Sequence, residues 1–161
     1  MIVRSASGAV FVALVVSSFF LPVIFQYVLF LFFTLVGTWE YLSIVEKGGN
    51  RPQKCLSMTA AALIISIGYL KHLYCIINIS WIIFVVTFVL LVFILVLIPI
   101  FELFRKHESP FTNIAHSYMP LVWVAFPFFL AGILYVEKTN VLALLILIWA
   151  SANFAYCGGS L

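Results

Sequence analysis

Five carboxylate side chains, all of them glutamates, limit the chemistry that these 161 residues can perform. Reactions of phosphate groups in a membrane normally use carboxylates that hold Mg²⁺ and cationic side chains that hold phosphate. The glutamates that fall in polar segments or at the ends of apolar runs are Glu46, Glu102, Glu108 and Glu137. Only Glu40 lies within an apolar run, so no two carboxylates share the inward face of a span. The sequence therefore predicts no metal site and no self-contained catalytic centre.

Glu40 is the first candidate for a functional residue, about one turn before the end of its apolar run. An ionisable group at the centre of a bilayer costs about 2.5–3.5 kcal/mol on insertion scales, and less near the interface. One interpretation is a functional carboxylate. The other is an interfacial glutamate that reaches water or pairs with Lys47 or another loop cation, between the aromatic anchors Trp39 and Tyr41.

Three further polar residues are candidates for a functional or interfacial role: Asn113, His116 and Asn153. We expect Asn113 to be the N-cap of a helix that begins near Ile114, with His116 at the cytoplasmic entry of that helix. Asn153 lies in the last apolar run, where it either hydrogen-bonds to a neighbouring helix or faces a cavity. His107 has no second ligand at helical spacing, which argues against a metal site there.

The overall composition is that of a protein surrounded by lipid. Hydrophobic residues make up 66% of the chain and charged residues only 8%, with a mean hydropathy of +1.27. Soluble domains carry about 25% charged residues, so a water-soluble fold is excluded. The 17 Phe, 7 Tyr and 4 Trp likewise exclude a disordered chain. The three cysteines show no metal-binding or disulfide spacing, and we interpret them as small apolar residues.

The net charge of +3 indicates lipid headgroups rather than nucleic acid as the charged partner. No run of basic residues is longer than the pair Arg105–Lys106, which is too little for a nucleic-acid surface. Loop cations near a membrane surface are attracted to anionic headgroups. The residues expected to contact anionic lipid are Arg51, Lys54, Arg105 and Lys106.

Charges and helix breakers divide the chain into apolar runs of membrane-spanning character. Leu21-Pro22 ends the first run, and Lys71-His72 interrupts the third. The runs are apolar on every face, which excludes the alternating strands of a membrane barrel and leaves helices, the only segments that satisfy their own backbone. We therefore expect an all-α polytopic transmembrane bundle forming one domain over residues 1–161, with Pro127 kinking the fifth helix. The six expected spans cover residues 7–20, 23–44, 56–70, 75–101, 117–136 and 141–156.

The distribution of basic residues predicts the orientation. With the N-terminus in the cytoplasm, six Lys and Arg residues lie inside and only Lys71 and Lys138 lie outside. The positive-inside bias therefore favours two cytoplasmic termini. A cleaved signal peptide over Met1–Pro22 is the alternative, but no cleavage site precedes a polar mature sequence.

Several segments resemble bacterial phosphatidate cytidylyltransferases, also called CDP-diacylglycerol synthases. The second expected span ends in the Gly-x-Trp-Glu pattern of that family, and the last contains a segment similar to its Trp-x-x-Asp-x-x-Ala-Tyr pattern. The order and spacing of the pieces extend over the whole chain. The resembling segments are Arg4–Ala13, Gly37–Tyr41, Ser109–His116, Ala125–Phe128 and Trp149–Tyr156.

The resemblance implies a multi-helix enzyme of the bacterial inner membrane. Such an enzyme joins phosphatidate and CTP, with Mg²⁺, to give CDP-diacylglycerol and pyrophosphate in phospholipid biosynthesis. Two departures stand out: Ala152 occupies the position of the family's aspartate, and the chain stops at Leu161, before the family's metal- and phosphate-binding signature. We therefore expect a truncated member that binds no Mg²⁺ and is inactive alone.

Two other functions stay open. A non-catalytic scaffold or subunit would supply helices to a partner, either a second copy of the chain or a separate chain carrying the C-terminal part. A small transporter would show inverted repeats and a charged residue at mid-membrane, and the sequence has neither.

Overall fold

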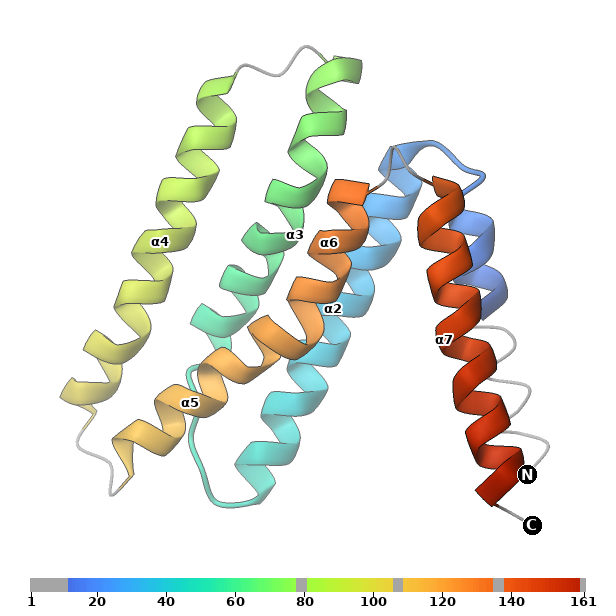
Figure 1. Cartoon of the computed structure of the whole chain (residues 1–161). Coiled ribbons are helices and arrows are strands. Elements are labelled where there is room, and N and C mark those ends of the chain that lie inside the picture. Colours follow the sequence, from blue (N-terminus) through green and yellow to red (C-terminus); the bar gives the residue numbers. More distant parts are fainter. Residues whose placement is uncertain (1–11, 78–80, 106–108, 135–137, 160–161) are drawn as a thin grey trace.

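The computed structural model describes residues 12–77, 81–105, 109–134 and 138–159. For residues 71, 73–77, 138, 145, 149 and 152–159 it describes only the helical backbone. Residues 12–18 are helical, and the elements that follow are α2 (Val23–Lys47), α3 (Lys54–Ile77), α4 (Trp81–Phe104), α5 (Pro110–Pro120), the π-helix η1 (Leu121–Ala125), α6 (Phe126–Ile133) and α7 (Lys138–Gly159). The described residues contain no strand, which confirms the all-α prediction. Successive rods run in alternating directions (Figure 1).

Among the described residues, three helical rods are long and apolar enough to cross a membrane: α2, α4 and the continuous α5–η1–α6 rod, Pro110–Ile133. Shorter apolar helices lie within α3, at Lys54–Leu70, and within α7, at Thr139–Ile148. The apolar character of these helices indicates a membrane protein. The count of six spans and the orientation of the termini stay predictions.

The helix boundaries confirm one of the expected breaks between helices and show that another was wrong. Leu21 and Pro22 separate residues 12–18 from α2, and Pro22 is the N-cap of α2. Lys71 and His72, in contrast, lie inside α3, which continues to Ile77. His72 lies within hydrogen-bonding distance of α6, with 2.9 Å between its Nε2 atom and the carbonyl oxygen of Gly132. A polar pair is tolerated within the helix because one member packs against a neighbouring rod.

The fifth rod bends where prolines interrupt its hydrogen bonding. A proline has no N–H to donate and its ring crowds the preceding turn. Pro120 ends α5, Pro127 lies in the first turn of α6, and the π turn Leu121–Ala125 connects the two helices. Figure 1 shows α5 and α6 meeting at an angle. The predicted kink is thus present, and a π turn accommodates it.

Small residues allow α3 to pack closely against several helices at once. Ala60 and Ala61 are fully buried in a cluster with Leu91 of α4 and with Leu121 and Ala125 of η1. Farther along α3, a Cβ atom built on Gly68 would lie 2.8 Å from the carbonyl oxygen of Phe129. On the opposite rod, a Cβ atom on Gly132 would lie 2.7 Å from the ring of Tyr69. The pair Gly68 and Gly132 therefore sets the distance between α3 and α6.

Aromatic side chains hold the other part of the core. Phe30 of α2 lies 6.3 Å from the ring of Phe19 and 5.0 Å from that of Phe128 of α6, measured between centroids. The same cluster contains Tyr69 of α3 and Val141 of α7. This cluster joins the first helical segment and α7 to the central rods.

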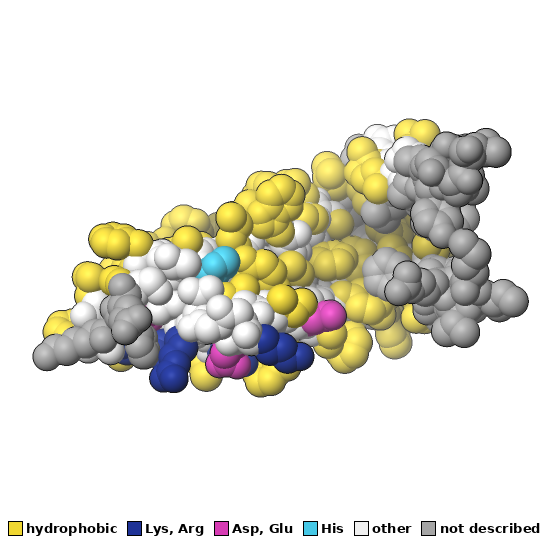
Figure 2. Space-filling model, turned by 90° about the horizontal axis from the view of Figure 1, so that it is seen from below, with side chains coloured by type: hydrophobic (Ala, Val, Ile, Leu, Met, Phe, Trp, Pro, Cys, Tyr) yellow, Lys and Arg dark blue, Asp and Glu magenta, His cyan; other side chains and the backbone are white. Residues whose placement is uncertain are grey.

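Charged side chains gather at one end of the bundle, where α2 and α4 end and where α3 and α5 begin. Seen from that end, dark blue, magenta and cyan side chains lie close together, with hydrophobic side chains around them (Figure 2). The sequence predicts the same grouping, because it assigns the connections between these helices to one side of the membrane. The candidate site lies at this end.

Candidate functional site

A buried glutamate organises the charged end. Glu102 lies in the last turn of α4 and its side chain is 0% exposed. Its Oε1 atom accepts a hydrogen bond of 2.6 Å from Nδ2 of Asn113. Its Oε2 atom accepts one of 2.8 Å from Nε2 of Gln53 and one of 3.3 Å from Nη1 of Arg105. A buried carboxylate is stable only with such partners, so Glu102 joins α4 to α5 and to the α2–α3 connection.

The backbone before α3 is fixed by side chains of α5. The Arg51 N–H donates to Oδ1 of Asn113 at 2.9 Å, and the Gln53 N–H donates to Oγ of Ser117 at 2.9 Å. The hydroxyl of Ser57 donates to the carbonyl of Ser117, also at 2.9 Å. Asn113 and Ser117 are one turn apart and both buried. Residues 51–53 are therefore held in one conformation although they lie outside any helix.

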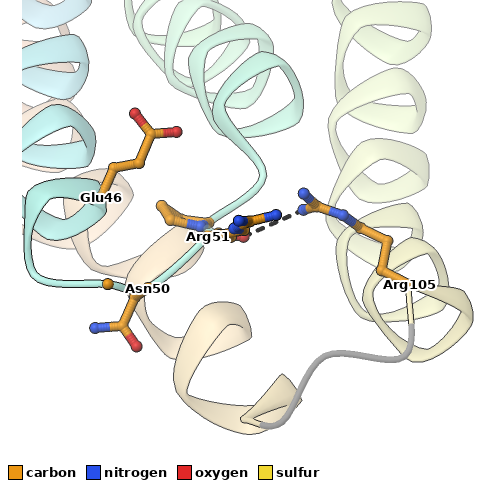
Figure 3. A pocket seen from close by; sticks show the side chains of 6 residues that line it. Glu46, Asn50, Arg51 and Arg105 are labelled. Atoms are coloured by element: carbon orange, nitrogen blue, oxygen red, sulfur yellow. Dashed lines mark hydrogen bonds between the residues drawn. The ribbon is translucent and has the colours of Figure 1, made fainter.

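An open pocket of about 530 Å³ lies beside this network. Its lining comes from the α2–α3 connection and from the end of α4: Glu46, Gly49, Asn50, Arg51, Pro52 and Arg105. Arg105 reaches from the end of α4 and donates from Nη1 to the carbonyl oxygen of Arg51 at 3.1 Å (Figure 3). The pocket thus has two guanidinium groups from segments 54 residues apart in the sequence.

The acidic residue of the pocket has its own partner. Glu46 and Lys54 form an ion pair of 2.5 Å across the α2–α3 connection. The Lys54 ammonium also lies 4.9 Å from the centroid of the Trp39 ring, a cation–π distance. The charge of Glu46 is therefore balanced by Lys54, which leaves the pocket with excess positive charge from its arginines.

Tyr41 and His116 form a second link between α2 and α5. The Tyr41 hydroxyl lies 3.0 Å from Nδ1 of His116, and either atom can be the donor, depending on the tautomer of the imidazole ring. His116 is half-buried. The predicted position of His116 at the entry of the fifth rod therefore gains a specific partner.

The residues expected to be functional have different outcomes. Glu40 is exposed, and neither ion pair found in the described part of the chain includes it, so the pairing with Lys47 that was one of its possible roles is absent there. Asn113 is not an N-cap: Ser109 precedes the helix, Pro110 occupies its first turn, and Asn113 lies inside. Lys106 and the side chain of Asn153 lie outside the described residues.

The site also contains residues that the sequence did not single out. Glu102 lies between Phe101 and Leu103 at the end of an apolar run, and Gln53 lies next to Lys54 at the edge of a polar segment. Neither pattern gives a sign of burial. One available signal is the i, i+4 spacing of Asn113 and Ser117 downstream of Pro110. That spacing indicates a polar helix face beginning earlier than residue 117.

Comparison with known proteins shows the relationship of the whole chain. A family model described as the cytidylyltransferase family matches residues 2–161. The chain belongs to the cytidylyltransferase family. This is the family of the CDP-diacylglycerol synthases, so the resemblance noted in the sequence is confirmed. No match was found among curated proteins or among solved structures.

The resemblance implies that cytidylyltransferases use Mg²⁺. The residues that the structure describes do not form a set of ligands for this ion. Within them, no group of three or more His, Cys, Asp or Glu side chains could hold a metal ion. Both carboxylate oxygens of Glu102 already accept hydrogen bonds from amide or guanidinium groups. The contacts of Glu102 in this family member are therefore hydrogen bonds to Gln53, Arg105 and Asn113.

Proposed function

We propose that this chain forms the membrane-embedded part of a phosphatidate cytidylyltransferase, which joins CTP and phosphatidate to give CDP-diacylglycerol and pyrophosphate. The observation that carries the proposal is the family match over residues 2–161. Two features support it: apolar rods long enough to cross a membrane, and a pocket with two arginines at the end where charged residues gather. A lipid substrate and a charged nucleotide meet at such a boundary.

In this proposal the 161 residues supply the scaffold and cationic groups, and they do not catalyse the reaction alone. Cytidylyl transfer with Mg²⁺ requires carboxylates that hold the metal. Of the five glutamates, Glu40 is exposed, Glu46 pairs with Lys54 and Glu102 is enclosed by its donors, whereas Glu108 and Glu137 lie outside the described residues. We therefore propose that the metal ligands come from residues outside this set, on a C-terminal part or a partner chain.

We further propose that the pocket end faces the cytoplasm at the bacterial inner membrane and contacts anionic lipid. Arg51, Lys54 and Arg105 lie at this end, and the Lys54 ammonium lies over the exposed indole of Trp39. Aromatic and basic side chains together are typical of the membrane–water interface. Lys106, the fourth expected contact, follows Arg105 directly in the chain.

The proposed function is tested by reconstitution. The chain is purified in detergent and assayed for CTP- and Mg²⁺-dependent formation of CDP-diacylglycerol, alone and with the C-terminal part of an active family member added as a separate chain. We expect product only from the combination, with the C-terminal part alone as the control. Turnover by the 161-residue chain alone would contradict its inactivity, and no turnover in any combination would contradict the function.

A scaffold that supplies helices to a partner is the second candidate, and the exposed face of α4 is where such a partner would bind. Most side chains of α4 are exposed although it is strongly apolar, and only Leu91, Ile98 and Glu102 are buried. This face suits either lipid or another protein. Crosslinking from an exposed position such as Phe88 in membranes separates the two: a discrete protein adduct indicates a partner, and lipid adducts alone argue against it.

A further inference from the structure

We infer that the pocket between Arg51 and Arg105 is a binding site for a terminal phosphate group. The inference deepens the proposed function and rests on it for the two sources of such a group, a lipid headgroup and a nucleotide or pyrophosphate. The chemistry of recognition is common to both: a phosphate monoester carries about −1.5 to −2 charges at neutral pH and three strong acceptor oxygens.

The two guanidinium groups have N–H donors that these hydrogen bonds do not use. Arg105 uses Nη1 for its bonds to the Arg51 carbonyl and to Glu102. Since a guanidinium carries five N–H donors, the Nε and Nη2 groups of Arg105 stay available. Both hydrogen bonds of Arg51 use its backbone N–H and carbonyl groups. Its side chain makes no hydrogen bond or ion pair with any residue in the described ranges. Planar forks of this kind match phosphate oxygens in pairs.

The guanidinium group of Arg105 and the backbone of Arg51 are held in place before a ligand arrives. Glu102 and the Arg51 carbonyl both accept from Nη1 of Arg105, which fixes the head of a side chain that is 38% exposed. Asn113 in turn fixes the backbone of Arg51 and donates to Glu102. A site whose donors are already ordered loses less conformational freedom on binding. The buried network behind the pocket therefore has a role in binding as well as in stability.

The charge balance favours an anion. Lys54 neutralises Glu46, and Glu102 balances Arg105, so the positive charge of Arg51 is left over at the pocket. The volume of about 530 Å³ lies within the usual range for small-ligand sites. A phosphate group with part of its headgroup or nucleotide fits this space.

Binding is measured with the full chain in phosphatidylcholine nanodiscs, so that no catalysis is needed. One arm incorporates phosphatidate in the lipid, and the other adds CTP or inorganic pyrophosphate to the solution. The variant is Arg51→Gln, which removes an exposed guanidinium. The matched control is Lys47→Gln, which removes one positive charge from the end of α2 without touching the pocket lining.

We expect Arg51→Gln to weaken phosphate binding about tenfold or more, the usual effect of losing a hydrogen bond to a charged group. Lys47→Gln should change it by less than about twofold, the effect of an exposed charge partly screened by salt. Arg51→Lys, which keeps the charge but not the fork, should bind with intermediate strength. Weaker binding of Arg51→Gln in the phosphatidate arm identifies a lipid headgroup as the ligand. Weaker binding in the soluble arm identifies a nucleotide or pyrophosphate as the ligand.

Equal effects of Arg51→Gln and Lys47→Gln in both arms would overturn the site and leave a diffuse basic surface. The outcome is separate from that of the proposed function. If Arg51→Gln does not alter the reconstituted turnover, the phosphate site is contradicted and the proposed enzymatic function is supported. If phosphate binding depends on Arg51 but no combination shows turnover, the phosphate site is supported and the proposed enzymatic function is contradicted.

Discussion

Asn113 donates a 2.6 Å hydrogen bond to Glu102, and this contact between two buried side chains joins the start of α5 to the end of α4. The same asparagine accepts a bond from the Arg51 backbone, so one side chain connects three segments. The pocket between Arg51 and Arg105 owes its shape to this connection.

Removal of the Glu102 carboxylate should destabilise the protein. Glu102→Ala leaves the buried amide of Asn113 and the Gln53 amide without their acceptor, at a cost of about 3 kcal/mol. Thermal unfolding in detergent, followed by circular dichroism, measures the loss. The control is Glu40→Ala at an exposed position, which should change stability by about 0.5 kcal/mol or less. Equal losses for the two variants would contradict the role of Glu102.

Glycines at the α3–α6 crossing should tolerate no side chain. Gly68→Ala places a Cβ atom 2.8 Å from a backbone oxygen of Phe129, which cannot move without shifting α6. We expect a loss of about 1–3 kcal/mol in the same unfolding measurement. Gly37→Ala is the control, because its Cβ atom meets only the two methyl groups of Val124, at 3.0 and 3.9 Å, which can move aside. A larger loss for Gly37→Ala than for Gly68→Ala would show that the crossing is looser than described.

Gln26→Met should stabilise the protein. Gln26 is fully buried in α2, and neither atom of its amide group has a hydrogen-bond partner among the described residues. Replacing an unpaired buried amide by an apolar side chain of similar length should gain about 1 kcal/mol. Phe25→Met, at an exposed position of the same helix, is the control and should be near neutral. A loss of stability for Gln26→Met would reveal a polar partner, such as a buried water.

The predicted orientation can be tested with single cysteines in a background free of the native ones. Asn50→Cys, in the connection between α2 and α3, should react with a membrane-impermeant thiol reagent only from the cytoplasmic face. Lys71→Cys, near the other end of α3, is the matched position and should react only from the opposite face. Labelling with the faces exchanged would contradict cytoplasmic termini.

Composition and breakers suffice to predict the helical membrane fold, whereas the site depends on contacts that the sequence hides. The break at Leu21-Pro22 is local, since a proline cannot continue the preceding hydrogen bonds. The burial of Glu102 is not local, because it requires donors from residues 49 and 11 positions away. Glu40, the acid nearest the middle of an apolar run, is exposed because it lies off the buried stripe of α2 that contains Thr38 and Leu42.

The π turn keeps the buried faces of α5 and α6 on the same side of the fifth rod. Asn113, Ser117, Leu121 and Ala125 are all buried although they recur at every fourth residue, a spacing that drifts around a regular α-helix. The wider π turn at Leu121–Ala125 takes up this drift. Insertion or deletion of one residue there would rotate Gly132 relative to Asn113. Packing at the glycine crossing and the geometry of the arginine pocket are thereby set by a single turn.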